Sequence, residues 1–438
     1  MILSALYLAA ALAADYGFVA KMDREPAIYA AGETAKVHVQ VFKDGQPFGG
    51  ARANCSWNYG SSNVVTIAQD GTDFELKLDR PGQVLFRGDL YDETGTNRLR
   101  GTFGEAKPRA LIVWAGALFS PEKLKPSRPR PADFDAYWDG EIARMNRLVP
   151  MSPGLTRITP AKDKEKGFVS FDVEIPCWPR PACAAVVLPE KASAGSLPAV
   201  VEFQGHGGSR SIRRSITNTL YMCVNAHGLG NDRPKEDWSA YFKGEGDDYQ
   251  HRGWESRETC FFHGQILRAV RALQWLKTRP EWNGRDLAVV GGSMGGSQSI
   301  QAAALDKDVT LCAPRDPAMC DHAGMFADPP HRSGWPWILA NPRHLPAVLD
   351  YGPADPELLK VSDYFDNVFF AARIRCPFRL SSGLSDDVCF SEGVMRAYNA
   401  VKGPKSFVTN PYAIHCGTVN PEESRLLGFA PSAAVTFK

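Results

Sequence analysis

Residues 291–295 read Gly-Gly-Ser-Met-Gly, which places a serine hydroxyl between two glycines in the pattern Gly-x-Ser-x-Gly. The pattern follows the apolar run 287–290 and precedes helix-compatible sequence. A serine on a sharp strand-to-helix turn takes strained backbone angles, and flanking glycines let the neighbouring backbone pass close by. The spacing therefore predicts Ser293 as a nucleophile, with Gly291 and Gly295 supporting the turn. A glycine-rich turn with a capping serine is the alternative.

A serine hydroxyl is a poor nucleophile near neutral pH, so it needs a base and a carboxylate that orients the base. Among the histidines that follow Ser293, His415 is the one that also follows a candidate acid. The segment 376–380 is expected to be a late strand, and it runs into the segment 381–387, which ends in Asp386 and Asp387. The order serine, acid, histidine is that of α/β-hydrolases. The residues predict a catalytic triad and leave the two acids as alternatives.

Acyl transfer also needs hydrogen-bond donors for the negative oxygen of the intermediate. One donor is expected to be the backbone N–H of Met294, the residue after the nucleophile. The second is assigned to the backbone N–H of His206, in the sequence Gln-Gly-His-Gly-Gly that follows an apolar run. Gly205 and Gly207 would let this loop approach a ligand closely. The alternative is an ordinary turn without a catalytic role.

The elements that must position these residues follow from the apolar pattern. From about residue 168, buried-type strands alternate with helical segments, which predicts a mostly parallel sheet of the α/β class. The expected strands are 199–203, 220–224, 287–290 and 378–380, and the expected helix is 266–276. In a parallel sheet the loops after the strands meet at one edge, so the candidate residues should converge there.

The first part of the chain has a different pattern. Residues 15–117 show short alternating runs such as 35–41, separated by turns such as Asp44-Gly45, and predict a small immunoglobulin-like β-sandwich. A proline-rich linker is expected over residues 118–132, followed by the catalytic domain over residues 133–438.

The first 14 residues are uncharged and mainly apolar and end in small residues, which predicts a secretory signal peptide and a secreted or periplasmic location. An apolar tail packed on the domain is the alternative. If the protein is exported, Cys177 and Cys183 are the cysteines that most plausibly form a disulfide. Most of the ten cysteines are expected to be buried thiols.

Composition excludes several classes of protein. The 438 residues carry 50 Lys+Arg against 49 Asp+Glu, so the formal charge is +1, which argues against a nucleic-acid-binding protein. The sequence has no apolar run long enough to span a membrane. It also lacks Cys-x-x-Cys and His-Glu-x-x-His spacings, so we expect no metal and no cofactor.

These residues resemble the acetyl xylan esterase and cephalosporin C deacetylase family of α/β-hydrolases over about residues 118–430. The resemblance rests on the segments 130–138, 268–273, 291–296, 383–389 and 412–415. In that family the acid stands three residues before a cysteine, which selects Asp386 over Asp387 because Cys389 follows at that distance.

The sequence departs from the family pattern at three places. Met294 replaces a common glutamine, His206 replaces a tyrosine, and Asn225-Ala-His-Gly228 replaces Asp-x-Arg-Gly. The resemblance implies a serine esterase that removes O-acetyl groups from acetylated xylan or xylo-oligosaccharides without a cofactor. It also implies a homo-oligomer, an assembly that the additional β-domain could obstruct. The alternatives are a hydrolase of another ester or of peptides, and a glycan-binding surface protein with an incidental triad.

Overall fold

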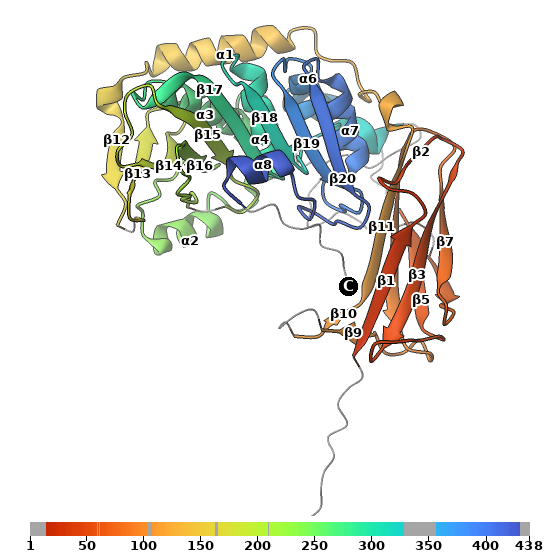
Figure 1. Ribbon diagram of the computed structural model, residues 1–438. Helices are drawn as coiled ribbons and strands as arrows, with labels where there is room; N and C mark the ends of the chain where they lie inside the picture. Colours follow the sequence, from red (N-terminus) through yellow and green to blue (C-terminus); the bar gives the residue numbers. More distant parts are fainter. Residues whose placement is uncertain are drawn as a thin grey trace, which may run out of the picture.

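The computed structural model describes residues 15–58, 60, 62–102, 107–162, 165–208, 210–327 and 356–429. The expected signal peptide, residues 1–14, lies outside the described residues. No helix within these ranges is long and apolar enough to cross a membrane. We call residues 15–119 the N-terminal unit and residues 120–429 the C-terminal unit. Figure 1 shows the strands of the N-terminal unit standing at one end of the C-terminal unit, which has helices around a central sheet.

The N-terminal unit consists of short strands with alternating burial. Ala35, Val37, Val39 and Val41 are each at most 1% exposed, and the residues between them are more accessible. One sheet contains β1 (Tyr16–Met22), β3 (Thr34–Lys43), β4 (Gln46–Pro47) and β7 (Thr72–Lys77). The other has the order β2 (Ile28–Tyr29), β11 (Ile112–Phe119), β8 (Gly82–Tyr91), β5 (Arg52–Trp57) and β6 (Ser62–Thr66). A short pair, β9 (Arg100–Gly101) and β10 (Arg109–Ala110), forms a separate two-stranded sheet.

Side chains from both larger sheets of this unit form one apolar core. Strands therefore lie where the alternating pattern predicts them. The classification of the unit as immunoglobulin-like stays a prediction.

The connection between the two units packs against the C-terminal unit. It contains the short 3-10 helix η1 (Pro121–Lys123) and leads to α1 (Phe134–Leu148). The Ser127 N–H and hydroxyl both donate to the Asp321 carboxylate, at 2.8 and 2.6 Å. Arg128 forms an ion pair with Asp363 at 3.1 Å. The prolines of this segment stiffen it, and these contacts in addition fix its path along the C-terminal unit.

The C-terminal unit is built on a nine-stranded mixed sheet within the described residues. Its order is β12 (Arg157–Pro160), β13 (Phe168–Ile175), β14 (Ala182–Pro189), β16 (Leu220–Val224), β15 (Leu197–Phe203), β17 (Trp282–Gly292), β18 (Leu311–Arg315), β19 (Phe378–Gly383) and β20 (Lys405–Asn410). The first three strands and the β14–β16 pair are antiparallel, and pairing from β16 to β20 is parallel. The loops after β15, β17, β18, β19 and β20 therefore share one edge.

Helices cover this sheet unequally. The larger core includes side chains from α1, α3 (Phe261–Leu276), α4 (Met294–Leu305), α6 (Asn367–Ala371) and α7 (Ser391–Ala400). Other side chains of the strands form a second, smaller core. This core includes Leu427, just after α8 (Pro421–Leu426). The remaining helical segments are α2 (Lys235–Lys243), α5 (Pro356–Ser362), η2 (Pro153–Leu155), η3 (Tyr249–His251) and η4 (His322–Phe326).

All ten cysteines are free thiols, and eight of them are buried. The bridge expected between Cys177 and Cys183 is absent from the described structure. Cys177 belongs to the larger core, where its sulfur contacts Met145 of α1 at 3.4 Å. Cys183 lies within β14, whose flanking residues Ala182 and Ala184 belong to that larger core. Alternation along the strand therefore directs Cys183 toward the opposite face of the sheet, away from Cys177.

Candidate active site

Ser293 lies at the sharp turn between β17 and α4. Its φ is 57° and its ψ is −125°, angles that residues other than glycine rarely adopt. A Cβ on Gly295 would lie 2.1 Å from the Phe203 carbonyl oxygen, so the close approach of β15 requires glycine there. The Ser293 N–H donates to the Arg315 carbonyl oxygen at 2.9 Å, which anchors the turn to the next strand. The local geometry is that of a nucleophile elbow.

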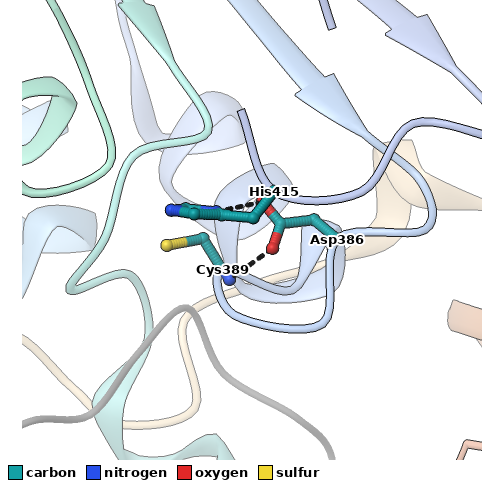
Figure 2. A group of neighbouring side chains, drawn as sticks. All are labelled: Asp386, Cys389 and His415. Atoms are coloured by element: carbon teal, nitrogen blue, oxygen red, sulfur yellow. Dashed lines mark hydrogen bonds and ion pairs between the residues drawn. The ribbon is translucent and has the colours of Figure 1, made fainter. Parts of the chain in front are cut away.

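His415 and Asp386 form a close pair after β20 and β19 (Figure 2). Nδ1 of His415 lies 2.8 Å from Oδ2 of Asp386. The other carboxylate oxygen accepts the backbone N–H groups of Val388 and Cys389, each at 2.8 Å. Asp386 is fully buried, whereas Asp387 is exposed. Of the two candidate acids, the structure places Asp386 against the histidine.

The surroundings of His415 favour its protonated form. Burial lowers the pKa of His415, but hydrogen bonds to Asp386 and to cysteine thiols outweigh burial and raise the pKa above its ordinary value. The sulfur of Cys416 lies 3.8 Å from Nε2. Burial raises the pKa of the neighbouring Cys389 thiol, which keeps that thiol neutral. An imidazole held by a carboxylate at Nδ1 can take a proton at Nε2, as a general base requires.

Asp386, Cys389 and His415 also form a group whose possible metal-ligating atoms all lie within 4.8 Å of one another. Both oxygens of Asp386 already accept hydrogen bonds. An ion bound by all three residues would compete with the hydrogen bond between Asp386 and His415. We therefore interpret the group as an acid–base pair with a flanking thiol and assign it no metal.

The loop that carries His415 lies beside the elbow. A Cβ on Gly292 would be 3.3 Å from the sulfur of Cys416. Arg315 donates to the Cys416 carbonyl oxygen at 2.9 Å. Within the described residues, Nδ1 of His415 bonds to Asp386 and Nε2 lies near the Cys416 sulfur, and no hydrogen bond joins the ring to Ser293. Bonds between nucleophile and base are often long without substrate and shorten when it binds.

The predicted oxyanion loop also reaches the elbow. A Cβ on Gly205 would lie 4.0 Å from the Cβ of Ser293. Gln298, in α4, donates its side-chain amide to the Gln204 carbonyl oxygen at 3.0 Å. Gly207 has a φ of 70°, a value that favours glycine. Because α4, which begins directly after Ser293, holds this loop, His206 lies on a segment that is fixed relative to Ser293.

Tyr249 is a residue that the sequence analysis does not predict. Its hydroxyl lies 2.5 Å from Nδ1 of His206 and 3.4 Å from the sulfur of Met294. The His206 and Tyr249 rings are stacked, with centroids 5.4 Å apart. Burial lowers the pKa of His206, so its imidazole is neutral near neutral pH. The Met294 side chain is fully buried, so this departure from the family pattern alters interior packing.

Asp316 is a second buried carboxyl group that sequence reasoning misses. It follows β18, and its Oδ1 accepts the Gly383 N–H at 2.8 Å. Burial and the nearby charge of Asp386 raise the pKa of Asp316, which favours its neutral form. A neutral Asp316 avoids a second negative charge beside the Asp386–His415 pair. An acid directly after a strand is a signal, but the proline and arginine within 311–315 hide the strand in the sequence.

Comparison with known proteins supplies an independent finding. Residues 118–432 match the sequence model of the acetyl xylan esterase family. Acetyl esterase Axe7A from Xylanibacter ruminicola is 26% identical over 432 residues, and the match covers 94% of this chain and 90% of that protein. This match therefore extends beyond the family region into the N-terminal unit.

Two solved structures show a related fold. The acetyl xylan esterase from Paenibacillus sp. R4 is 22% identical, with a TM-score of 0.57, and the match covers 70% of this chain and 98% of that one. Acetyl xylan esterase 1 from Thermoanaerobacterium sp. JW/SL YS485 is 19% identical, with a TM-score of 0.55, and the match covers 70% and 96% of the two chains. At these identities the two structures support the α/β-hydrolase-type fold of the C-terminal unit.

Proposed function

This chain belongs to the acetyl xylan esterase family, and from that membership we propose that it removes O-acetyl groups from acetylated xylan or xylo-oligosaccharides. It is a carboxylic-ester hydrolase. The observation that supports the detailed proposal is the 2.8 Å pairing of His415 with Asp386 beside the strained turn at Ser293. This arrangement suits acyl transfer through a serine ester.

In the first half of the proposed reaction, Oγ of Ser293 attacks the acetyl carbonyl carbon while Nε2 of His415 takes the hydroxyl proton. The charge of Asp386 stabilises the imidazolium ion that forms. The backbone N–H groups of His206 and Met294 donate to the negative oxygen of the tetrahedral intermediate. His415 then gives its proton to the sugar oxygen, the bond between that oxygen and the acetyl carbon breaks, and the acetyl group remains on the serine.

In the second half, water enters where the sugar alcohol has left. His415 takes a proton from the water while the oxygen of the water attacks the acetyl carbon. The new tetrahedral intermediate collapses, the bond to Oγ of Ser293 breaks, and His415 returns the proton to the serine. The product leaves as acetic acid, which ionises to acetate in solution, and the scheme uses no cofactor.

A substrate panel tests the proposed specificity. We expect the protein to release acetate from acetylated xylo-oligosaccharides, with faster turnover than for aryl amides. Acetate release from the oligosaccharides, cleavage of the aryl amides and hydrolysis of a small activated acetate ester are measured in parallel. Faster cleavage of the amides would favour a peptidase-like function. Hydrolysis of the activated ester without acetate release from the oligosaccharides would retain the esterase chemistry and exclude the proposed carbohydrate.

Replacing Tyr249 by phenylalanine is expected to lower kcat about fivefold, because one hydrogen bond typically contributes about 1 kcal/mol. The change removes the hydroxyl contacts to His206 and Met294 and keeps the stacked ring. Tyr241→Phe is a matched control, since that hydroxyl lies 3.3 Å from Nδ1 of His227 instead. Steady-state kinetics on the activated ester measure both variants. An unchanged kcat for Tyr249→Phe would show that the contacts of this hydroxyl to His206 and Met294 do not contribute to turnover.

We also propose that residues 1–14 are removed during export and that the secreted protein begins with the immunoglobulin-like unit. The uncharged, apolar character of residues 2–13 supports this proposal. N-terminal sequencing of protein recovered from the native host tests it, and an intact Met1 would contradict it. Analytical ultracentrifugation of the same sample tests the homo-oligomer that the family resemblance implies.

A further inference from the structure

The apolar core of the N-terminal unit includes a residue from the loop that carries Asp386. Leu384, two positions before the acid, is fully buried among side chains of this core. The β11 backbone approaches it so closely that a Cβ on Gly116 would lie 1.8 Å from the Leu384 carbonyl oxygen. The position of the acid loop therefore depends on where β11 lies. Figure 1 shows β11 beside β20, at the end of the C-terminal sheet.

Gln83 of β8 binds the acid loop at two points. Its side-chain amide donates to the Leu384 carbonyl oxygen at 2.7 Å, and its Oε1 accepts the Glu392 N–H at 3.0 Å. Gln83 is 5% exposed, so these bonds are shielded from water. One side chain of the N-terminal unit thus spans the acid loop from before Asp386 to the start of α7.

The loop that carries His415 is held from the same side. The Pro411 carbonyl oxygen accepts the Gly116 N–H at 2.8 Å and the hydroxyl of Ser385 at 2.7 Å. The hydroxyl of Tyr412 accepts the Met22 N–H at 2.6 Å. Pro411 therefore links three segments: β11, the acid loop and the histidine loop.

A buried charge lies on this boundary as well. Glu392 is 3% exposed, and its carboxylate accepts the Gln83 backbone N–H at 3.1 Å. Arg80 of the N-terminal unit and Arg396 of α7 pair with the same carboxylate, at 3.4 and 3.0 Å. Separating the two units would break the bonds of this carboxylate to Gln83 and Arg80. Hydrogen bonds and an ion pair therefore hold the two units together at this boundary.

We propose that the N-terminal unit is a positioning element of the active site. In this proposal Gln83 and Gly116 hold the loops of Asp386 and His415 in their positions relative to each other. This inference rests on the proposed serine esterase function. Catalytic groups must be held within fractions of an ångström by their supporting residues, and a displacement of about 1 Å can lower the rate about a hundredfold. Gln83 and Gly116 act through the loops and do not touch the reacting atoms.

Gln83→Leu and Gly116→Ala in the full-length protein test the proposal. We expect Gln83→Leu to lower kcat on a small activated acetate ester about tenfold to a hundredfold, with KM within about twofold of wild type. Gly116→Ala should lower kcat at least as strongly, because its Cβ cannot fit against the Leu384 backbone. Gln83→Leu keeps the test valid if Gly116→Ala fails to fold.

Two control variants separate positioning from general stability. Gly88→Ala, in β8 of the same unit, adds a Cβ whose nearest neighbour is the Phe86 ring at 3.4 Å, an ordinary contact. Leu76→Ala removes a fully buried side chain of the same core from β7, which pairs with β3 in the sheet that contains neither β8 nor β11. Leu76→Ala should lower Tm, yet both controls should keep kcat within about twofold of wild type at temperatures well below their Tm.

A spectroscopic readout is independent of turnover. The proton in the hydrogen bond between His415 and Asp386 should give a strongly downfield proton NMR signal, which His415→Ala would identify. We expect Gln83→Leu to shift or broaden this signal and Leu76→Ala to preserve it.

The outcomes distinguish this inference from the function on which it rests. Hydrolysis by the wild type that does not depend on Ser293 would overturn the proposed function. With that dependence established, an unchanged kcat and an unchanged NMR signal in Gln83→Leu would overturn the positioning role. An equal loss of kcat in Leu76→Ala would also overturn it, since general stability would then explain the effect.

Discussion

Replacing Ser293 by alanine is expected to reduce kcat for acetyl-ester hydrolysis by about 10⁴- to 10⁶-fold. Without Oγ no acyl-enzyme can form, and the residual rate is that of water attacking an acetyl group held in the oxyanion site. KM should change little, because the substitution removes one atom from an intact pocket. Acetate release from acetylated xylo-oligosaccharides, followed over hours at high enzyme concentration, measures the remaining activity.

The same experiment needs proof that the protein is folded. Alanine at position 293 must adopt the same positive φ as the serine, so we expect Tm to stay close to that of the wild type. Ser299→Ala is a matched control on the same helix, where the hydroxyl donates to the Gly295 carbonyl oxygen at 2.9 Å. It should retain most of the activity. A folded Ser293→Ala protein with more than about a tenth of wild-type kcat would exclude Ser293 as the nucleophile.

Much of this architecture is predictable because strong local signals coincide with tertiary constraints. The apolar runs 199–203 and 287–290 become β15 and β17, since buried parallel strands need continuous apolar sequence. The glycines around Ser293 are predictable for a related reason, because the Phe203 carbonyl oxygen leaves no room for a Cβ at Gly295. Family resemblance was needed to choose between Asp386 and Asp387, which local sequence does not separate.

Other features depend on contacts between distant segments, which a single sequence does not encode locally. Strand β18 contains Pro314 and Arg315. The Arg315 side chain forms an ion pair with Glu423, more than a hundred positions away. Tyr249 belongs to a short 3-10 helix without a motif, and only the fold brings it to His206. The bonds of Gln83 to the acid loop likewise join residues about three hundred positions apart.

Replacing Asp386 by asparagine is expected to lower kcat about 10³- to 10⁴-fold while leaving the fold intact. The amide can no longer stabilise the imidazolium ion, and it can favour the wrong tautomer of His415. Steady-state kinetics on the activated ester measure the loss. Asp387→Asn is the matched control, because that neighbouring carboxylate is exposed, and it should keep nearly full activity.

The same substitution should move the acid limb of the pH profile to lower pH. Catalysis needs neutral His415, so kcat rises as the pH passes upward through the histidine's pKa. In the wild type, burial lowers this pKa, and the hydrogen bonds to Asp386 and the cysteine thiols more than offset burial. Removing the Asp386 charge leaves burial in place, and the pKa of His415 must therefore fall.

Profiles of kcat against pH for Asp386→Asn and Asp387→Asn test this shift. Asp316 is the neighbouring group that could alter it, because the charge of Asp386 helps to keep Asp316 neutral. Without that charge Asp316 ionises more readily and can partly support the imidazolium ion, which would reduce both the shift and the loss of kcat. An Asp386→Asn/Asp316→Asn double variant removes this substitute and should show the full effect. An acid limb that moves to higher pH in Asp386→Asn would contradict the assignment of Asp386 as the partner of His415.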